Sequence, residues 1–169
     1  LGNVTRMVYD ERGNRTRTIY PNGDYLQFTY NSRGQMIRRT DGAGREFTYE
    51  YDAYGYVARI LDPLGTQTTT RYDIIGRLLS KTDTNGATTS YEYDDCRQKT
   101  AEIDPLGART TYVYNPNGKL LSVTNPLGET RTRVYDDYDN LVEETDALGA
   151  TTRYDYDALG RVVARTDAE

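Results

Sequence analysis

The chain has 169 residues, of which 36% are hydrophobic, and its 26 acidic and 21 basic side chains leave a net charge of −5. That charge is small for a disordered chain, and 17 Tyr and 24 Thr favour strands over helices, so composition argues against disorder, helix bundles and coiled coils and predicts an all-β protein. The mild acidity gives no reason to expect nucleic acid or an anionic membrane as a partner, and the lack of His removes the commonest general base and metal ligand.

Neither targeting nor membrane signals stand out in the sequence. No apolar run approaches the roughly 18 residues of a membrane-spanning helix, and residues 1–10 show no basic segment followed by an apolar one. We therefore expect no membrane insertion and no signal peptide, and we interpret the start of the sequence as part of a longer chain. Cys96 is the only cysteine, which excludes an internal disulfide.

A repeat of 21 residues runs through the whole chain. Glycine recurs at this interval: Gly2, Gly23, Gly44, Gly65, Gly86, Gly107, Gly128 and Gly149. Tyrosine recurs at the same interval: Tyr9, Tyr30, Tyr51, Tyr72, Tyr93, Tyr114, Tyr135 and Tyr156. We call these the repeat tyrosines, and each is followed by Asp or Asn. Eight copies in phase leave no room for a linker, so we expect a single repeat array over residues 1–169 in which these Tyr and Gly residues are structural.

Two turns and two strands account for each copy, as its residues show in chain order. The first two copies depart from the common pattern in one turn each, at 20–23 and 41–44. The common pattern is complete at the next junction, where residues 62–65 and 73–76 have the D-x-x-G preferences of tight turns. These turns leave strands at 66–72 and 77–82. Connections this short join antiparallel neighbours, so the sequence predicts a continuous antiparallel β-meander of about sixteen strands, arranged as tandem hairpins.

A second glycine follows most repeat tyrosines by four residues, and Arg97 and Asp139 replace it in two copies. If this residue is the left-handed one of a three-residue loop, Tyr72 lies opposite Leu78, whereas a four-residue loop would place Tyr72 opposite Arg77. We favour the first register because it gives aromatic–aliphatic pairs across the strands. The position of Leu79 is apolar as well, so neither face is expected to be cleanly polar.

Several groups of residues were weighed as candidate sites. The Asp94-Asp95 pair belongs to a repeated turn, and residues 136–140 lack the glycine and terminal Glu of a calcium-binding EF-hand loop. Cys96 has no His beside it to act as its base, and the lone G-x-G at 42–44 precedes no helix. Rows of tyrosine could stack on sugars, but their fixed place in each copy favours cross-strand packing. We therefore expect no catalytic, cofactor-binding or metal-binding residues.

The motifs of the repeat resemble a known family. The sequences YDIIGRL at 72–78 and YDALGRV at 156–162, with DPLG at 62–65 and 104–107, resemble the Rhs/YD repeat of bacterial polymorphic toxins, insecticidal toxin-complex proteins and teneurins. The resemblance implies a long β-strip that curls into a hollow shell. In the toxins this shell encloses a C-terminal toxin and is closed by a self-cleaving protease, whereas in teneurins it is a cell-surface module.

The same resemblance implies a function. The chain would be a non-catalytic wall segment of a shell that encapsulates a toxin or effector, with adjacent repeats and the enclosed toxin as partners and a secreted or cell-surface location. The alternative is a surface adhesion or carbohydrate-binding module. Because a meander has two unpaired edges, near 1–10 and 161–169, edge-to-edge self-association is also expected.

Overall fold

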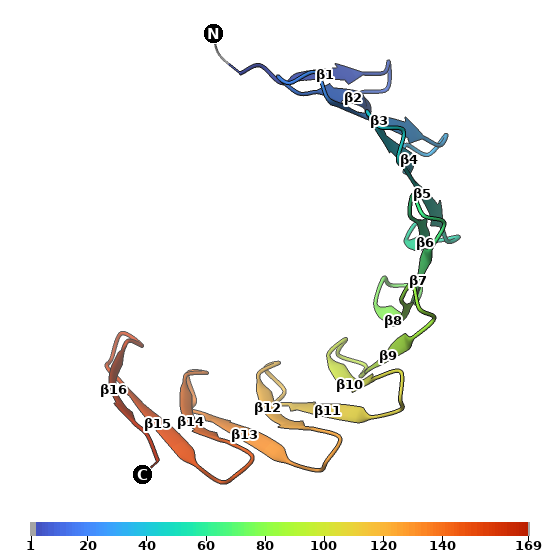
Figure 1. Cartoon of the computed structure of the whole chain (residues 1–169). Helices are drawn as coiled ribbons and strands as arrows, with labels where there is room; N and C mark the ends of the chain where they lie inside the picture. Colours follow the sequence, from blue (N-terminus) through green and yellow to red (C-terminus); the bar gives the residue numbers. More distant parts are fainter. Residues whose placement is uncertain (1–2, 169) are drawn as a thin grey trace. The chain divides into compact units, whose positions relative to one another are not determined.

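The computed structural model describes residues 3–168, and over this range it consists of strands and turns without a helix. The sixteen strands are antiparallel and lie in one sheet in sequence order, from β1 to β16 (Figure 1). The predicted all-β meander is therefore confirmed. Contacts divide the chain into two compact units, Leu1–Thr88 and Thr89–Glu169.

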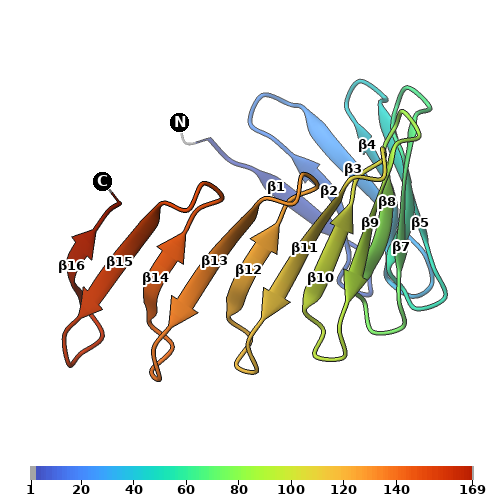
Figure 2. The same cartoon turned by 90° about the horizontal axis from the view of Figure 1, so that it is seen from below.

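Within each unit, successive strands lie side by side and the turns follow two opposite borders (Figure 2). The first unit holds β1 Arg6–Tyr9, β2 Arg15–Ile19, β3 Tyr25–Tyr30, β4 Met36–Asp41, β5 Glu46–Tyr51, β6 Val57–Leu61, β7 Gln67–Tyr72 and β8 Leu78–Thr82. Apart from Thr88, the first residue of β9, the second unit holds β9 Thr88–Tyr93, β10 Lys99–Ile103, β11 Arg109–Tyr114, β12 Leu120–Thr124, β13 Thr130–Tyr135, β14 Leu141–Thr145, β15 Thr151–Tyr156 and β16 Val162–Thr166.

The turn at Asp73 shows why the D-x-x-G sequence closes a hairpin. The Asp73 carbonyl accepts a hydrogen bond from the Gly76 N–H at 3.0 Å, and Gly76 has a φ of 87°, which L side chains rarely adopt. The Asp73 carboxylate accepts from the N–H groups of Ile75 and Arg77 at 3.0 and 2.9 Å. This is the three-residue loop with a left-handed last residue, and it sets Tyr72 opposite Leu78, so the favoured register is confirmed.

The copies that lack the second glycine keep the same turn. Arg97 and Asp139 have φ values of 69° and 65°, and the Arg97 N–H donates to the Asp94 carbonyl at 3.1 Å as a glycine would. The turns at 20–23 and 41–44 also keep the pattern, since the N–H groups of Gly23 and Gly44 donate to the carbonyls of the residues three positions earlier. The neighbouring turns and strands therefore impose one backbone geometry on sequences that differ.

Each hairpin contains a second irregularity that the sequence reasoning missed. Tyr72 pairs with Leu78, but the preceding residue, Arg71, pairs with Ser80, so Leu79 is an extra residue in its strand. All eight hairpins show this shift beside the repeat tyrosine. Such a β-bulge restarts the alternation of side chains, so the apolar Leu79 position does not oblige the opposite face to be apolar. The side opposite the repeat tyrosines nevertheless carries apolar residues, such as Val113 and Val134, in line with the expectation that neither face is cleanly polar.

Burial in this sheet is shallow. Among the described residues, only Phe28 and Ala101 form a buried apolar core, at 8% and 0% exposure, and Thr18 is the buried polar residue. The repeat tyrosines are half-buried, except Tyr9, which is exposed. Tyr72 and Tyr93 are covered in part by neighbours on adjacent strands, and nothing in the described residues covers the sheet as a second layer.

Candidate functional site

The repeat tyrosines lie on one side of the sheet, which we call the tyrosine face. On β7 this face carries Thr68, Thr70 and Tyr72, and the alternate residues lie on the other side, which we call the polar face. Across the hairpin, Leu78 and Lys81 share the tyrosine face with their partners Tyr72 and Thr70. The polar face of the same hairpin carries Thr, Ser and Arg side chains.

Hydroxyl groups on the tyrosine face join four of the hairpins to the hairpin before. The donor in each bond is a repeat tyrosine, and the acceptor is the carbonyl of the residue 15 positions earlier: Tyr30 to Arg15 at 2.8 Å, Tyr51 to Met36 at 2.7 Å, Tyr135 to Leu120 at 3.2 Å and Tyr156 to Leu141 at 2.8 Å. Each acceptor is itself paired with the preceding repeat tyrosine and borders the bulge. A carbonyl beside a disrupted ladder thus gains a partner from the next copy.

Partial burial raises the pKa of two repeat tyrosines, Tyr51 and Tyr114. Burial, together with the neighbouring tyrosines, raises the pKa of Tyr51 above its ordinary value of 10.0. Burial also raises the pKa of Tyr114, despite the opposing charge of Lys99. Both hydroxyls therefore remain neutral groups with a proton to donate at physiological pH.

One copy arranges this region differently. The ring of Tyr72 lies 5.2 Å from that of Tyr56, centroid to centroid, and the Thr70 hydroxyl donates to the carbonyl of Val57, the residue 15 positions before Tyr72. The Tyr56 hydroxyl lies over the next turn, where a Cβ on Gly76 would meet it at 2.6 Å. Gly76 is therefore required both by its φ and by the close approach of an aromatic side chain.

Cationic side chains also lie on the tyrosine face. The Lys99 ammonium group is 4.5 Å from the ring centroid of Tyr112 and 5.6 Å from that of Tyr91, and it pairs with a Glu102 carboxylate oxygen at 2.7 Å. Although partial burial opposes it, hydrogen bonding to Glu102 and Tyr112 raises the pKa of Lys99. Arg15 lies similarly over Phe28, at 5.0 Å. Contacts of this kind stabilise the sheet through cation–π attraction without forming an apolar core.

The polar face carries ion pairs between side chains as well. Arg109 on β11 binds Glu92 on β9 through two hydrogen bonds of 2.6 Å, and the pair spans β10 at the position of Ala101. The hydrogen bonds to Arg109 lower the pKa of Glu92. A small side chain at Ala101 leaves room for this bridge, which accounts for its complete burial.

The groups weighed as chemical sites serve turns in the structure. The Asp136 carboxylate accepts from the N–H groups of Tyr138 and Asn140, both at 2.9 Å, so this segment is a capped turn. Cys96 is exposed at a turn. No group of three or more His, Cys, Asp or Glu side chains suited to a metal ion occurs within residues 3–168.

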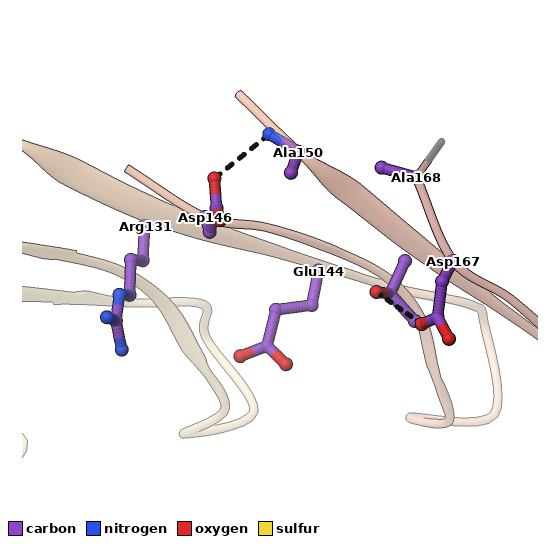
Figure 3. Close-up of a pocket in the computed structure, with 7 residues that line it drawn as sticks. Arg131, Glu144, Asp146, Ala150, Asp167 and Ala168 are labelled. Carbon is purple, nitrogen blue, oxygen red and sulfur yellow. Dashed lines mark hydrogen bonds between the residues drawn. The ribbon is translucent and has the colours of Figure 1, made fainter. Parts of the chain in front are cut away.

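A shallow pocket in the second unit gathers several charged side chains, among them Arg131, Glu144, Asp146 and Asp167 (Figure 3). Three of these have structural partners. Asp146 accepts from the Ala150 N–H at 2.9 Å, Asp167 accepts from the Thr152 hydroxyl at 3.1 Å, and Glu144 pairs with Arg133 at 2.9 Å. The carboxylates of this pocket are thus engaged in turn, edge and cross-strand contacts.

The part of the chain that the structure describes holds no helix of the length and apolarity needed to cross a membrane.

Comparison with protein families gives matches to the RHS repeat over residues 30–67, 72–109, 100–130 and 135–169, which together cover most of the chain. The chain belongs to the RHS repeat family. The resemblance of its Tyr-Asp and Asp-Pro-Leu-Gly motifs to this family is thereby confirmed. The matches span both compact units, so the same type of repeat builds each of them.

This RHS repeat array is similar to a short part of one Rhs protein and, in its fold, to parts of two larger structures. A protein of Dickeya dadantii (strain 3937) named "Probable deoxyribonuclease RhsB" is 43% identical over 51 residues, which is 30% of this chain and 4% of that protein. The TcdB2-TccC3 structure without its hypervariable C-terminal region aligns over 96% of this chain and 13% of its own, with a TM-score of 0.59 and 14% identity. A mutant Tc holotoxin pore of Photorhabdus luminescens aligns over 98% and 13%, with a TM-score of 0.50 and 12% identity. The chain therefore spans a small part of each, and the structural likeness shows a shared fold.

Sequence reasoning found the repeat tyrosines but missed what their hydroxyls do. The bond from Tyr51 to the Met36 carbonyl joins two hairpins, and a period of 21 residues does not reveal a contact over 15. The usable signal was that a repeated residue was Tyr and not Phe in every copy, since the hydroxyl is the difference between them. Lys99 and its partner Glu102 were missed as well, because only this copy combines a Lys and a Glu at the two positions.

Proposed function

We propose that this RHS repeat array is a wall segment of a shell that encloses a toxin or effector cargo, and that its role is structural and not catalytic. The observation that carries the proposal is the joint between hairpins, in which a tyrosine such as Tyr51 donates to the carbonyl of the preceding copy. Because this contact recurs with the same spacing in four copies, further copies can be added without changing the design. Such a wall can be made as long as its cargo requires.

The relatives support the proposal. A sheet of more than about ten strands has to curl or split, so a longer array of these hairpins would produce the enclosing surface that the toxin family uses. TcdB2-TccC3, which shares this fold, carries a hypervariable C-terminal region, and RhsB is named as a probable deoxyribonuclease. In the same way, the parent of this chain would hold its toxin behind the array, with adjacent repeats and the toxin as partners. It would act as a secreted or cell-surface protein.

Protease protection of the parent protein tests this function. We expect the cargo to resist cleavage in the intact protein and to become accessible when Tyr51→Phe and Tyr156→Phe remove two hairpin-joining hydroxyls. Tyr138→Phe is the matched control, because Tyr138 is 87% exposed at a turn and is not a repeat tyrosine. If the cargo were cleaved as fast in the unmodified protein as in the variant with Tyr51→Phe and Tyr156→Phe, enclosure would be contradicted.

A carbohydrate-binding or adhesion module is the second candidate, and the half-burial of the repeat tyrosines favours it. Part of each ring remains accessible, as stacking on a sugar requires. Titration of the chain with neutral oligosaccharides, followed by tyrosine fluorescence, tests this candidate. Saturable binding that Tyr72→Ala weakens and Tyr138→Phe does not would favour it over the shell wall.

A further inference from the structure

Three turns of the array contain the dipeptide Asn-Gly, at 22–23, 85–86 and 117–118. In each of them the glycine N–H donates to the carbonyl of the residue three positions earlier, at 3.0, 3.1 and 2.9 Å in chain order. The glycine φ lies between 84° and 88°, and all three asparagines are exposed. The three turns therefore share one backbone geometry, and they differ in what surrounds the asparagine side chain.

Two of the three asparagine side chains are held by hydrogen bonds. The Asn22 carboxamide donates to an Asp24 carboxylate oxygen at 2.7 Å and accepts from the Asp24 N–H at 3.1 Å. The Asn117 carboxamide donates to a carboxylate oxygen of Asp139, at the next turn along the same border of the sheet, at 3.2 Å. Both side chains are thus tied to a charged partner, and such bonds are stronger than those between neutral groups.

The third asparagine, Asn85, has a free side chain. Its backbone N–H donates to the Asp83 carboxylate at 2.8 Å, but its carboxamide makes no hydrogen bond within residues 3–168. A Cβ added to Gly86 would meet nothing within 4 Å, whereas one added to Gly118 would meet the Gln98 amide nitrogen at 3.0 Å. The Asn85 carboxamide can therefore rotate beside an uncovered glycine.

We propose that Asn85 is a site of spontaneous deamidation, in which its carboxamide becomes a carboxylate without the help of an enzyme. The Gly86 amide nitrogen loses its proton and attacks the side-chain carbonyl carbon of Asn85. The new C–N bond closes a succinimide ring, and the carboxamide nitrogen takes up a proton and leaves as ammonia. Water then opens the ring at either carbonyl, which gives aspartate or isoaspartate. Glycine favours the attack because no Cβ shields its nitrogen or restricts rotation of the chain into the reactive geometry.

Conversion at Asn85 would weaken the turn at 83–86. The new carboxylate lies in the same turn as that of Asp83, which accepts from the N–H groups of Asn85 and Ala87 at 2.8 and 3.0 Å. Isoaspartate also adds a methylene group to the backbone between Asp83 and Gly86, whose 3.1 Å hydrogen bond closes the turn. Like charges and a longer loop both favour opening. The inference does not depend on an enclosed cargo.

Peptide mass spectrometry of the folded chain, kept at mildly alkaline pH, tests the site. Alkaline conditions speed the first step because the attacking amide has to lose its proton. We expect Asn85 to convert faster than Asn117, and Asn117 faster than Asn22, since the described residues give them no, one and two side-chain hydrogen bonds. Each bond that must break should slow conversion about fivefold, which corresponds to about 1 kcal/mol. Conversion at Asn22 or Asn117 that equals or outpaces that at Asn85 would overturn the inference.

Releasing one of the held side chains is a control that leaves every Asn-Gly sequence intact. Asp139→Gly removes the carboxylate that holds Asn117 and supplies the glycine that six other copies have at this position. Conversion of Asn117 should then rise about fivefold, while that of Asn85 stays unchanged. In urea, where the folded-state hydrogen bonds are lost, the three sites should react at similar rates. A lead of Asn85 that persists unchanged in urea, or an Asn117 that does not respond to Asp139→Gly, would overturn the inference.

Discussion

The tyrosine face and the polar face hold the same strands together by different means. On the tyrosine face, Tyr51 reaches a backbone carbonyl of the preceding hairpin, and Tyr30, Tyr135 and Tyr156 do the same. On the polar face, charged side chains reach each other instead, as Glu92 and Arg109 do across a strand, and ion pairs with other partners occur on this face in further copies. A contact to the backbone needs one side chain per copy, whereas an ion pair needs two, so the first is the easier to repeat.

The two faces should therefore differ in how much they stabilise the sheet. A half-buried tyrosine contributes both ring packing and a hydrogen bond, while an ion pair exposed to solvent contributes about 0–1 kcal/mol. Both side chains of the Glu92–Arg109 pair are about half exposed, at 51% and 45%. We expect substitutions on the tyrosine face to lower the free energy of unfolding by more than those on the polar face.

The largest effect is expected for Tyr51→Ala, which removes both contributions. We predict a loss of roughly 2–3 kcal/mol in the free energy of unfolding, below the 3–5 kcal/mol of a fully buried aromatic residue because Tyr51 is half-buried. Tyr51→Phe, which removes the hydroxyl alone, should lose about 1 kcal/mol. Urea unfolding measures both, with Tyr54→Ala as an exposed control. A loss under about 0.5 kcal/mol for Tyr51→Ala, the range of surface sites, would contradict the prediction.

Alanine substitutions at two turn glycines, Gly65 and Gly76, distinguish the effect of backbone strain from that of a steric clash with a neighbouring side chain. Gly65 has a φ of 82° and nothing within 4 Å of an added Cβ, so Gly65→Ala should lose about 1–2 kcal/mol through its left-handed backbone alone. Gly76→Ala should lose more, because its Cβ would also meet the Tyr56 hydroxyl at 2.6 Å. In a Tyr56→Ala background the two substitutions should become equal in urea unfolding. A difference that persists there would mean that Tyr56 is not its cause.

Replacing Arg97 by glycine should raise stability by a similar amount, because Arg97 also has a left-handed backbone conformation. It has a φ of 69° in a turn where six other copies have glycine, so Arg97→Gly should raise the free energy of unfolding by about 1 kcal/mol. Arg97→Ala keeps the strain and should give little gain, which makes it the control. Equal gains for Ala and Gly in thermal unfolding would point to the loss of the arginine charge instead of the backbone.

Acid should weaken the turns in a predictable window. Hydrogen bonds from Thr66 lower the pKa of Asp62 below 3.8, and those from Asn140 and Arg161 do the same for Asp136 and Asp157. A carboxyl whose pKa is depressed on folding adds stability above its unfolded pKa and loses it as pH falls through the folded pKa. The free energy of unfolding should therefore decline below about pH 4.

Asparagine provides a matched test of this acid effect, because Asn125 caps its turn with the same two N–H contacts and does not titrate. Replacing Asp62, Asp136 and Asp157 together by Asn should flatten the decline when urea midpoints are measured against pH. A decline as steep as that of the unmodified chain would assign the acid sensitivity to other groups.

The local design could be predicted from the sequence because each hairpin is set by short-range turn chemistry. The D-x-x-G spacing left two registers open, and the preference for aromatic–aliphatic pairs selected the one that places Tyr72 opposite Leu78. Each strand near this turn is one residue shorter than predicted. The bulge at Leu79 could not be predicted, since reading alternation along a strand assumes that no residue is extra. The contacts of Lys99 with Tyr112 and of Glu92 with Arg109 join residues on neighbouring or next-nearest strands, and their partners became evident only with the register.

The smallest effect is expected for the ion pair on the polar face. In a double-mutant cycle of Glu92→Gln and Arg109→Gln, we predict a small favourable coupling energy at low salt that falls toward zero at high salt, because both side chains are accessible to counterions. The bidentate geometry and the lowered pKa of Glu92 argue for a measurable value and not for none. The Lys99–Glu102 pair on the tyrosine face is the matched comparison, since the ring of Tyr112 lies beside Lys99 and the pKa of Lys99 is raised. Its coupling should respond less to salt. If the polar-face pair proved the stronger and the less sensitive to salt, the view that the tyrosine face holds the hairpins together would be wrong.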